Sequence, residues 1–423
     1  MRSLLPFAFL LVATPLVAQS RPASSPASLG FSSERLTRID RVLREYVDSS
    51  RVAGAVVLVM RHGQVAYTDA VGMADREAKR PMTPDALFRL ASMSKPVTSV
   101  AVLMLVEEGR IALGDPVSKW IPAYANAKVA TRSDTGRVLT PVKRPITIRD
   151  LLTHSAGISY GVDSLVQADY RAQGFGPAAG YGWYFADKNE GTCASIDRLA
   201  TLPIVAQPGE KFVYGYNTDI LGCVVERASG MPYADFLQRR LFTPLGMKDT
   251  RFFVEPRDTL RLTSVYTIAA DGSLARADTG ARGQGHYVQG PRVNTAGGAG
   301  LVGTARDYAR FLQMLLNGGT LDGHRILSPR TVQLLTTDQL GPVYTVENRG
   351  FGLGVEVHED PAGSGQYGSV GMYGWQGAYS TAFWVDPKED AIGVMMVQVL
   401  PRGRLDLAER FKTLVFQSMV DGR

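Results

Sequence analysis

The residues best suited to chemistry in this chain of 423 residues are Ser92 and Lys95, which form its only Ser-x-x-Lys pattern. Residues three apart on a helix share a face, so the amine of Lys95 can contact the hydroxyl of Ser92. A serine hydroxyl is a poor nucleophile until a neighbouring base takes its proton. Lysine can be that base where its positive charge is disfavoured, as a helix N-terminus and partial burial both do. Proline is tolerated in a first helical turn, so Pro96 predicts that the helix begins close to Ser92.

Two further segments carry groups that could assist a serine nucleophile. Tyr214 precedes an apolar helical pattern, and a tyrosine hydroxyl near a lysine can carry a proton to or from a leaving group. Residues 373–378 read Tyr-Gly-Trp-Gln-Gly-Ala and open a predicted strand, whose small residues let a substrate approach backbone N–H groups. Taken alone, a tyrosine beside an apolar run more often serves packing, and a Gly-rich strand entry is a weak signal because such strand ends have many uses.

A second serine motif matches a known catalytic pattern but lacks the structural context that the pattern requires. Residues 157–161 read Gly-Ile-Ser-Tyr-Gly and match the G-x-S-x-G turn of α/β-hydrolases. That turn needs a strand before the serine and a helix after it, whereas residues 146–154 predict a helix. We therefore do not expect Ser159 to be a nucleophile. In the rejected alternative, a histidine such as His286 or His358 would be its partner.

The elements that position these residues come from both ends of the chain. Periodicity predicts a helix over 36–47, a β-hairpin over 54–72 and a helix over 93–108. The C-terminal part predicts three strands and a last helix, over 351–357, 379–385, 392–399 and 405–419. We expect the α+β class: one antiparallel sheet flanked by helices, with a mostly helical insertion beside it.

The domain boundaries follow from this pattern. Residues 31–423 are expected to form one unit, in which 31–114 and 291–423 make the α/β part and 115–290 the mostly helical part. Residues 1–19 have the charge, apolar run and small-residue end of a secretory signal peptide, with cleavage near Ala18; an uncleaved anchor is the alternative. A flexible linker is expected over residues 20–30, which are rich in Ser, Pro and Ala.

Composition excludes several classes of protein. With 45% hydrophobic and 20% charged residues the chain is globular, and 46 basic against 40 acidic residues give a net charge of only +6. The basic residues are scattered, so a nucleic-acid groove is not expected. No Cys/His spacing predicts a metal site, and no cofactor is expected. Cys193 and Cys223 could pair in an oxidising compartment or remain buried thiols.

In this order along the chain, Ser92-x-x-Lys95, Tyr214 and the strand entry at Trp375 resemble the serine β-lactamase and penicillin-binding protein superfamily. The sequence is most similar to the class C-like branch that includes the family VIII carboxylesterases. The resemblance extends from about Ser33 to the last helix. Supporting stretches are residues 87–91, 115–117, 148–157, 297–301 and 307–308.

The resemblance implies a β-lactamase/transpeptidase-like fold with the site between its two parts. Ser92 would be the acylated nucleophile, with Lys95 and Tyr214 sharing the general base and acid roles. The backbone N–H groups of Ser92 and Ala378 would form the oxyanion hole. Trp375, Gly377, Tyr216 and Asn217 would contact the substrate.

Two departures from the superfamily pattern bear on the substrate. The β-lactamase branch usually has Tyr-x-Asn, but here Tyr216 takes the third place and Asn217 comes one residue late. Trp375 stands where penicillin-recognising members carry Lys or His, whose cation can pair with a substrate carboxylate. Tryptophan offers apolar area instead, and family VIII esterases are similar in having W-x-G there.

These observations favour an exported serine esterase, periplasmic or secreted, that acts on a small-molecule ester. It would bind no nucleic acid and keep no stable membrane anchor after signal removal; its oligomeric state stays open. The alternatives are a β-lactamase or D-amino-acid (DD-) peptidase of the same superfamily, and an inactive binding or scaffold homologue.

Overall fold

The computed structural model describes most of the chain, with seven separate gaps. The predicted signal peptide over residues 1–19, the first part of the linker, and His286 lie outside the described residues. Pro26–Leu29 form a 3-10 turn and Leu29 is buried, so the end of the stretch predicted as a linker packs against the fold. The described residues are 25–134, 136–176, 188–269, 271–277, 287–400 and 405–421.

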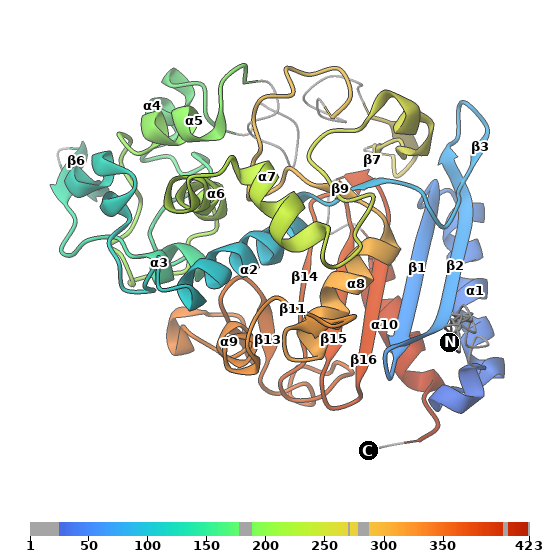
Figure 1. The fold of residues 1–423 in the computed structure, drawn as a ribbon. Coiled ribbons are helices and arrows are strands. Elements are labelled where there is room, and N and C mark those ends of the chain that lie inside the picture. Colours follow the sequence, from blue (N-terminus) through green and yellow to red (C-terminus); the bar gives the residue numbers. More distant parts are fainter. Residues whose placement is uncertain are drawn as a thin grey trace, which may run out of the picture.

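An eight-stranded antiparallel sheet is built from both ends of the chain, which confirms the predicted architecture (Figure 1). The N-terminal hairpin joins the C-terminal strands where β1 pairs with β16. In spatial order the strands are β12 (Arg349–Phe351), β13 (Glu356–His358), β14 (Tyr373–Gln376), β15 (Ala382–Asp386), β16 (Ala391–Met396), β1 (Gly54–Arg61), β2 (Gln64–Asp75) and β3 (Arg80–Pro81).

Three predicted strands have different bounds. The strand expected over 351–357 is a reversal between β12 and β13, in which Gly354 has a φ of +105° that favours glycine. The strand expected over 392–399 ends at Met396, and β17 (Val399–Leu400) pairs in parallel with β7 (Tyr266–Ile268) in another sheet. The strand expected over 379–385 begins only at Ala382. Nearly all residues of these runs are buried, so alternation could not show where they turn.

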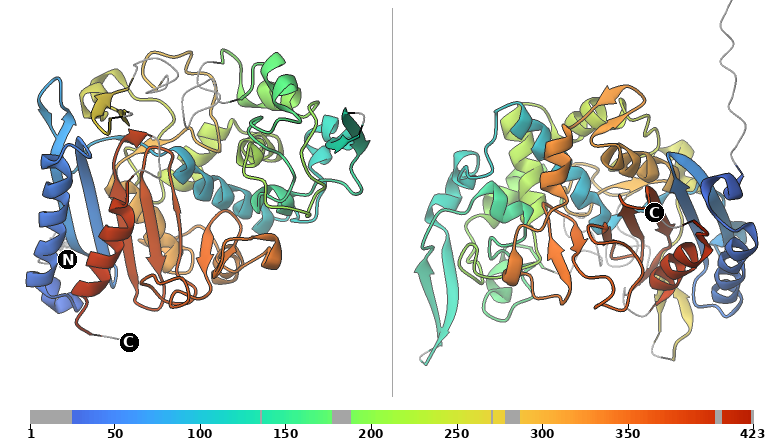
Figure 2. Two further views of the ribbon diagram at one scale, coloured as in Figure 1. Left: turned by 180° about the vertical axis from the view of Figure 1, so that it is seen from behind. Right: turned by 90° about the horizontal axis from the view of Figure 1, so that it is seen from below.

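Helices cover both faces of the sheet. On the outer face, α1 (Ser33–Asp48) and α10 (Leu407–Ser418) lie side by side, as the view from behind in Figure 2 shows. Ser32 caps α1 through the backbone N–H of Arg35, and the apolar stripe of α1 faces the sheet, as its periodicity predicts. On the inner face, α8 (Ala305–Leu316) packs against β1 and β16.

The central helix α2 (Ser94–Glu107) runs from the sheet into the second part of the molecule (Figure 1). It contacts α6 (Asn217–Ser229) and is buried on all sides from Ser94 to Leu105. The second part also contains α3 (Ile148–Leu152), α4 (Gln167–Ala172), α5 (Thr192–Leu199) and α7 (Tyr233–Leu237), with the hairpin β5 (Lys128–Ser133)–β6 (Gly136–Pro141). The β7–β8 (Leu274–Arg276) hairpin forms a separate three-stranded sheet with β17. Short connecting elements are β4 (Phe88–Arg89), β9 (Val302–Gly303), β10 (Thr320–Leu321), β11 (His324–Arg325) and α9 (Pro329–Leu335).

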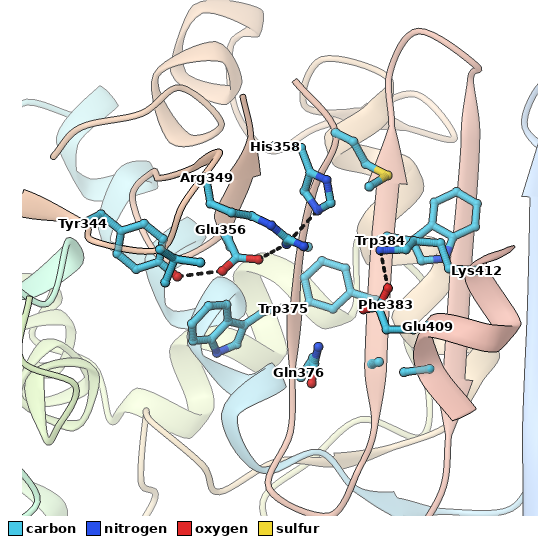
Figure 3. Close-up of a pocket in the computed structure, with 15 residues that line it drawn as sticks. Tyr344, Arg349, Glu356, His358, Trp375, Gln376, Phe383, Trp384, Glu409 and Lys412 are labelled. Carbon is cyan, nitrogen blue, oxygen red and sulfur yellow. Dashed lines mark hydrogen bonds and ion pairs between the residues drawn. The ribbon is translucent and has the colours of Figure 1, made fainter. Parts of the chain in front are cut away.

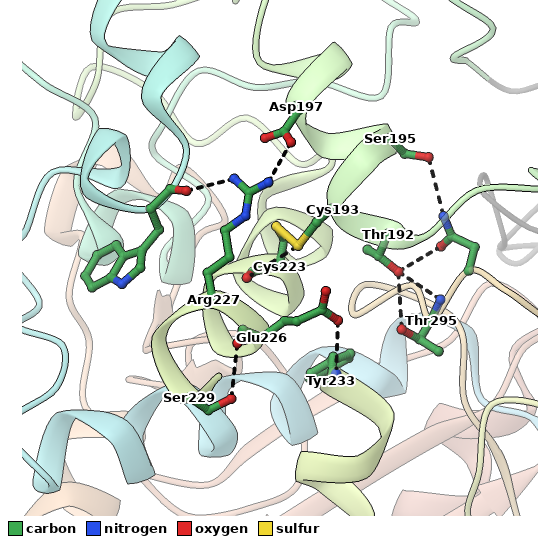
Figure 4. Close-up of a disulfide and its surroundings, with 12 residues drawn as sticks. Thr192, Cys193, Ser195, Asp197, Cys223, Glu226, Arg227, Ser229, Tyr233 and Thr295 are labelled. Atoms are coloured by element: carbon green, nitrogen blue, oxygen red, sulfur yellow. Dashed lines mark hydrogen bonds and ion pairs between the residues drawn. A yellow bond between two sulfur atoms is a disulfide. The ribbon is translucent and has the colours of Figure 1, made fainter. Parts of the chain in front are cut away.

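A disulfide joins two neighbouring helices of this second part. Cys193 of α5 and Cys223 of α6 are bonded, with their Cα atoms 5.0 Å apart (Figure 4). This answers the question that the sequence left open. In the described part of the chain, we find no helix that combines the length and apolar character needed to cross a bilayer.

Candidate active site

Ser92 lies in a 3-10 turn, Ala91–Met93, immediately before α2. It is partly exposed, whereas Lys95 in the first turn of α2 is only 1% exposed. The Lys95 Nζ donates to Ser92 Oγ at 3.1 Å, the contact expected from their spacing. Ala91, just before the serine, has a φ of +46°, a strained conformation for a residue with a Cβ.

Hydrogen bonds from distant segments hold this turn in place. The Tyr308 hydroxyl of α8 donates to the Met93 carbonyl at 2.9 Å. The Leu301 N–H donates to Ser94 Oγ at 3.1 Å. The position of Ser92 is therefore fixed from two sides.

Three oxygens surround the Lys95 amine. Besides Ser92 Oγ, it donates to the Tyr160 hydroxyl at 3.1 Å and to the Gly298 carbonyl at 2.7 Å. Tyr160 was not predicted as a site residue; it lies inside the G-x-S-x-G segment, over residues 157–161, that was not expected to be catalytic.

Ser159 of that segment is buried, and its Oγ accepts from the Gly161 N–H at 3.0 Å. The hydroxyl therefore stabilises its own turn. His358, a notional partner of Ser159, lies on β13 and contacts Arg349 instead. The geometry agrees with the expectation that Ser159 is no nucleophile.

Tyr214 arrives beside Lys95 from the segment before α6. The Lys95 Nζ lies 4.7 Å from the centre of the Tyr214 ring. The Trp375 indole N–H donates to the Tyr214 hydroxyl at 3.4 Å, and the two ring centres are 5.7 Å apart. The structure thus brings together four of the residues selected from the sequence, and both Tyr214 and Trp375 are partly exposed.

A buried histidine supports the Tyr214 ring. The His154 ring lies 4.7 Å from that of Tyr214 and is nearly inaccessible. Burial, with a smaller effect of the Lys95 charge, holds the pKa of His154 well below its usual value. The ring is therefore neutral and accepts at Nδ1 from the Asn217 amide at 2.9 Å.

The structure contradicts the assignment of Tyr216 and Asn217 to the substrate-binding set. Both are 0% exposed because they begin α6 with their side chains inside the fold. The Tyr216 hydroxyl accepts from the Gly176 N–H at 3.1 Å. The Asn217 amide also donates to the carbonyls of Ile158 and Val213, both at 3.2 Å. Their role is to hold the Tyr214 segment.

The end of β14 lies against the turn that carries Ser92. A Cβ on Gly377 would lie 2.5 Å from the Leu90 carbonyl oxygen and 2.2 Å from Thr381 Oγ1, so only glycine permits this approach. Gly377 is buried and its N–H donates to the Thr381 carbonyl at 2.8 Å. Ala378, the next residue, is partly exposed. The Ser92 N–H opens a helical turn, where backbone donors have no partner in a preceding turn.

Trp375 also borders a pocket of about 260 Å³ beside α10, which Ser92, Lys95 and Tyr214 do not line (Figure 3). Arg349, paired with Glu356, donates to His358 Nε2 at 2.8 Å. Lys412 pairs with Glu409 at 2.8 Å. The charged groups of this pocket are therefore largely neutralised by one another.

The fold and the Ser92–Lys95 contact point to one class of protein, the serine hydrolases. The comparisons agree with that class. A family model described as Beta-lactamase matches residues 39–415, and the chain belongs to this family. It is a serine hydrolase of the β-lactamase superfamily.

Its relatives include named esterases. Esterase EstB of Burkholderia gladioli is 33% identical over 366 residues, which cover 82% of this chain and 86% of the esterase. Lovastatin esterase of Penicillium rubens is 30% identical over 394 residues, covering 86% and 93% of the two chains. The solved structure of EstCE1, a hydrolase with promiscuous acyltransferase activity, has a TM-score of 0.76 and 27% identity, covering 90% of this chain and 99% of that one.

Proposed function

We propose that this protein hydrolyses carboxylic esters of small or medium acids through an acyl-enzyme on Ser92. The observation that carries the proposal is the 3.1 Å contact between the buried Lys95 amine and the partly exposed Ser92 hydroxyl. A base held at hydrogen-bond distance is what a serine needs to act as a nucleophile.

The reaction proceeds in two acyl transfers. Ser92 Oγ attacks the ester carbonyl as its proton passes to the Lys95–Tyr214 pair. The alcohol leaves with a proton delivered through Tyr214, and water then attacks the acyl-enzyme by the same route to release the acid. The backbone N–H groups of Ser92 and Ala378 stabilise the negative oxygen in both steps.

Trp375 favours an ester over a β-lactam or a peptide C-terminus. The latter two present a carboxylate, which a cation at this position would pair with and an indole cannot. The Trp375 N–H is moreover directed to Tyr214, and its ring offers apolar area to an acyl or alcohol group. Relatives named as esterases, which cover most of the chain, support the same substrate class.

Turnover of p-nitrophenyl butyrate and of a chromogenic cephalosporin, compared on one enzyme preparation, tests this proposal. We expect kcat/KM to be much higher for the ester, and both activities to disappear in Ser92→Ala. Dominant cephalosporin hydrolysis would instead favour the β-lactamase or peptidase alternative. A folded protein that neither turns over these substrates nor reacts with a fluorophosphonate at Ser92 would be the inactive homologue.

We also propose that the protein is exported, with cleavage near Ala18. The Cys193–Cys223 disulfide supports export because such bonds persist in oxidising compartments. Cell fractionation followed by N-terminal sequencing tests this: the expected product begins just after Ala18 outside the cytoplasm. Recovery of the uncleaved chain from the cytoplasm would contradict it.

A further inference from the structure

Asp219 is a buried carboxylate next to the proposed catalytic groups. It lies in the first turn of α6, five residues after Tyr214, and is 3% exposed. Its Oδ1 accepts from the Gly298 N–H at 3.0 Å. The carbonyl of the same glycine accepts from the Lys95 amine at 2.7 Å. Gly298 therefore connects Asp219 to the lysine through its two backbone polar groups.

This connection requires a glycine. A Cβ on residue 298 would lie 2.5 Å from Asp219 Oδ2 and 2.9 Å from its Cγ. A larger residue would displace either the Asp219 carboxylate or this loop, and either shift would break the contact between them. The close approach is thus specific to this pair of positions.

Charge acts together with this contact. Lys95 faces Asp219 from α2, the Tyr233 hydroxyl faces it from α7, and the Gly298 N–H faces it from the loop. Burial is the largest influence and raises the pKa of Asp219 to about 6, while the Lys95 charge and the Gly298 N–H oppose that rise. Above this pH, Asp219 therefore carries a negative charge beside the amine.

We propose that Asp219 is a positioning residue for Lys95: through Gly298 it fixes the amine against Ser92, and its charge stabilises the ammonium formed during acyl transfer. The proposal rests on the function proposed above. The proton leaves Ser92 Oγ for the Lys95–Tyr214 pair and departs with the alcohol, while Asp219 remains ionised throughout. Because the amine gains positive charge as the serine attacks, the carboxylate acts on the transition state.

If the Asp219 charge had only a structural role, removing it would reduce activity only by destabilising the fold. The pH dependence of stability shows why that loss of stability is not expected. The pKa of folded Asp219 lies above that of an unfolded aspartate, about 3.9, so the folded state binds more protons between pH 4 and 6. Its contribution to stability is therefore present at low pH and lost as the pH rises through about 6. Removing the charge at pH 8 should not destabilise the fold, although it should slow the reaction.

Asp219→Asn separates these outcomes, because asparagine keeps an acceptor for Gly298 and loses the charge. We expect kcat for p-nitrophenyl butyrate at pH 8 to fall about 10-fold to 100-fold with little change in KM, and Tm to stay equal or rise. Asp307→Asn is the matched control: Asp307 is a buried aspartate that accepts from the Asp249 N–H at 2.7 Å, away from Lys95. We expect this control to keep the wild-type kcat.

The pH profile of the wild-type enzyme provides a second readout, and this readout does not depend on the folding of a variant. In the wild type, kcat should fall as the pH decreases through about 6, and Asp219→Asn should lose that decline. The proposal is overturned if wild-type kcat is flat across this range. It is also overturned if Asp219→Asn keeps the wild-type rate and profile, or loses activity only in step with Tm.

The rate of fluorophosphonate labelling at Ser92 distinguishes failure of the proposed role of Asp219 from failure of the proposed esterase function. If the wild type is labelled but hydrolyses no ester, the substrate proposal fails, and slower labelling of Asp219→Asn still supports the role of Asp219. Equal labelling rates would overturn that role. If the wild type is not labelled at all, both proposals fail.

Discussion

Lys95 is the residue at the centre of the proposed chemistry. Its amine is buried and makes three hydrogen bonds, to Ser92, Tyr160 and Gly298. Two tyrosines therefore stand close to it in different ways. Tyr160 accepts from the amine through its hydroxyl, whereas Tyr214 lies against it with its ring face and receives the Trp375 N–H.

Replacing each tyrosine by phenylalanine tests this difference. Tyr214→Phe removes the proposed proton carrier, so kcat should fall about 10²-fold to 10⁴-fold. Tyr160→Phe removes one of three acceptors of the amine, and a loss of about 10-fold is expected. Steady-state kinetics with p-nitrophenyl butyrate checks both, with Tm as the control for folding. A larger loss in Tyr160→Phe would place the proton route on Tyr160.

Among the elements, β14 positions the site by ending against the turn that carries Ser92. Gly377→Ala would bring its Cβ to within 2.5 Å of the Leu90 carbonyl oxygen. We expect kcat to fall and the free energy of unfolding to drop by about 1–3 kcal/mol, a usual cost of overpacking. Gly114→Ala is the matched control, since nothing lies within 4 Å of a Cβ there. Equal kinetics in wild type and Gly377→Ala would contradict the account.

The disulfide between α5 and α6 makes a second prediction at this scale. It closes a loop with a sequence separation of 30, so reduction should lower the free energy of unfolding by about 2–4 kcal/mol. Urea unfolding with and without reductant measures the loss. A Cys193→Ser, Cys223→Ser double variant should be insensitive to reductant. Two free thiols in the non-reduced native protein would show that the bond is absent.

For the whole molecule, stability should decrease in mild acid. Burial, with the nearby charges of Arg349 and Lys412, lowers the pKa of His358 to about 3, and that of His154 is also held well below the usual value. Below about pH 6.5 the unfolded chain therefore binds more protons than the folded one. Each histidine then removes up to about 1.4 kcal/mol of stability per pH unit, while Asp219 acts in the opposite direction.

Thermal unfolding between pH 7.5 and pH 5 checks this dependence. His358→Asn should reduce the decrease in Tm, because its side chain cannot titrate. His324→Asn is the control, since His324 is exposed on β11. A Tm that does not change with pH in the wild type would contradict the expected sign.

How much the sequence could predict depends on how local each feature is. Helix α1 and the β1–β2 hairpin follow from periodicity, and the Ser92–Lys95 contact follows from spacing within one turn. Tyr160 and Gly298 reach Lys95 across sequence separations of 65 and 203, so only the folded chain shows them.

The contacts of the residues that start α6 could not be predicted from the sequence either. Tyr216 and Asn217 stand near Tyr214 in sequence, but helix geometry turns them inside the fold, where they hold the segment in place. A motif position gives the residue type and not the direction of its side chain. The substrate-binding assignments were therefore the part of the site that the sequence predicted least well.

The central claim is that Ser92 carries the acyl group during ester hydrolysis. Acid quenching of the enzyme during turnover of p-nitrophenyl butyrate, followed by mass spectrometry of its peptides, tests the claim most directly. We expect one butyryl group on the peptide that contains Ser92, and none in Ser92→Ala. Butyrylation of another residue, or continued turnover by Ser92→Ala, would contradict it.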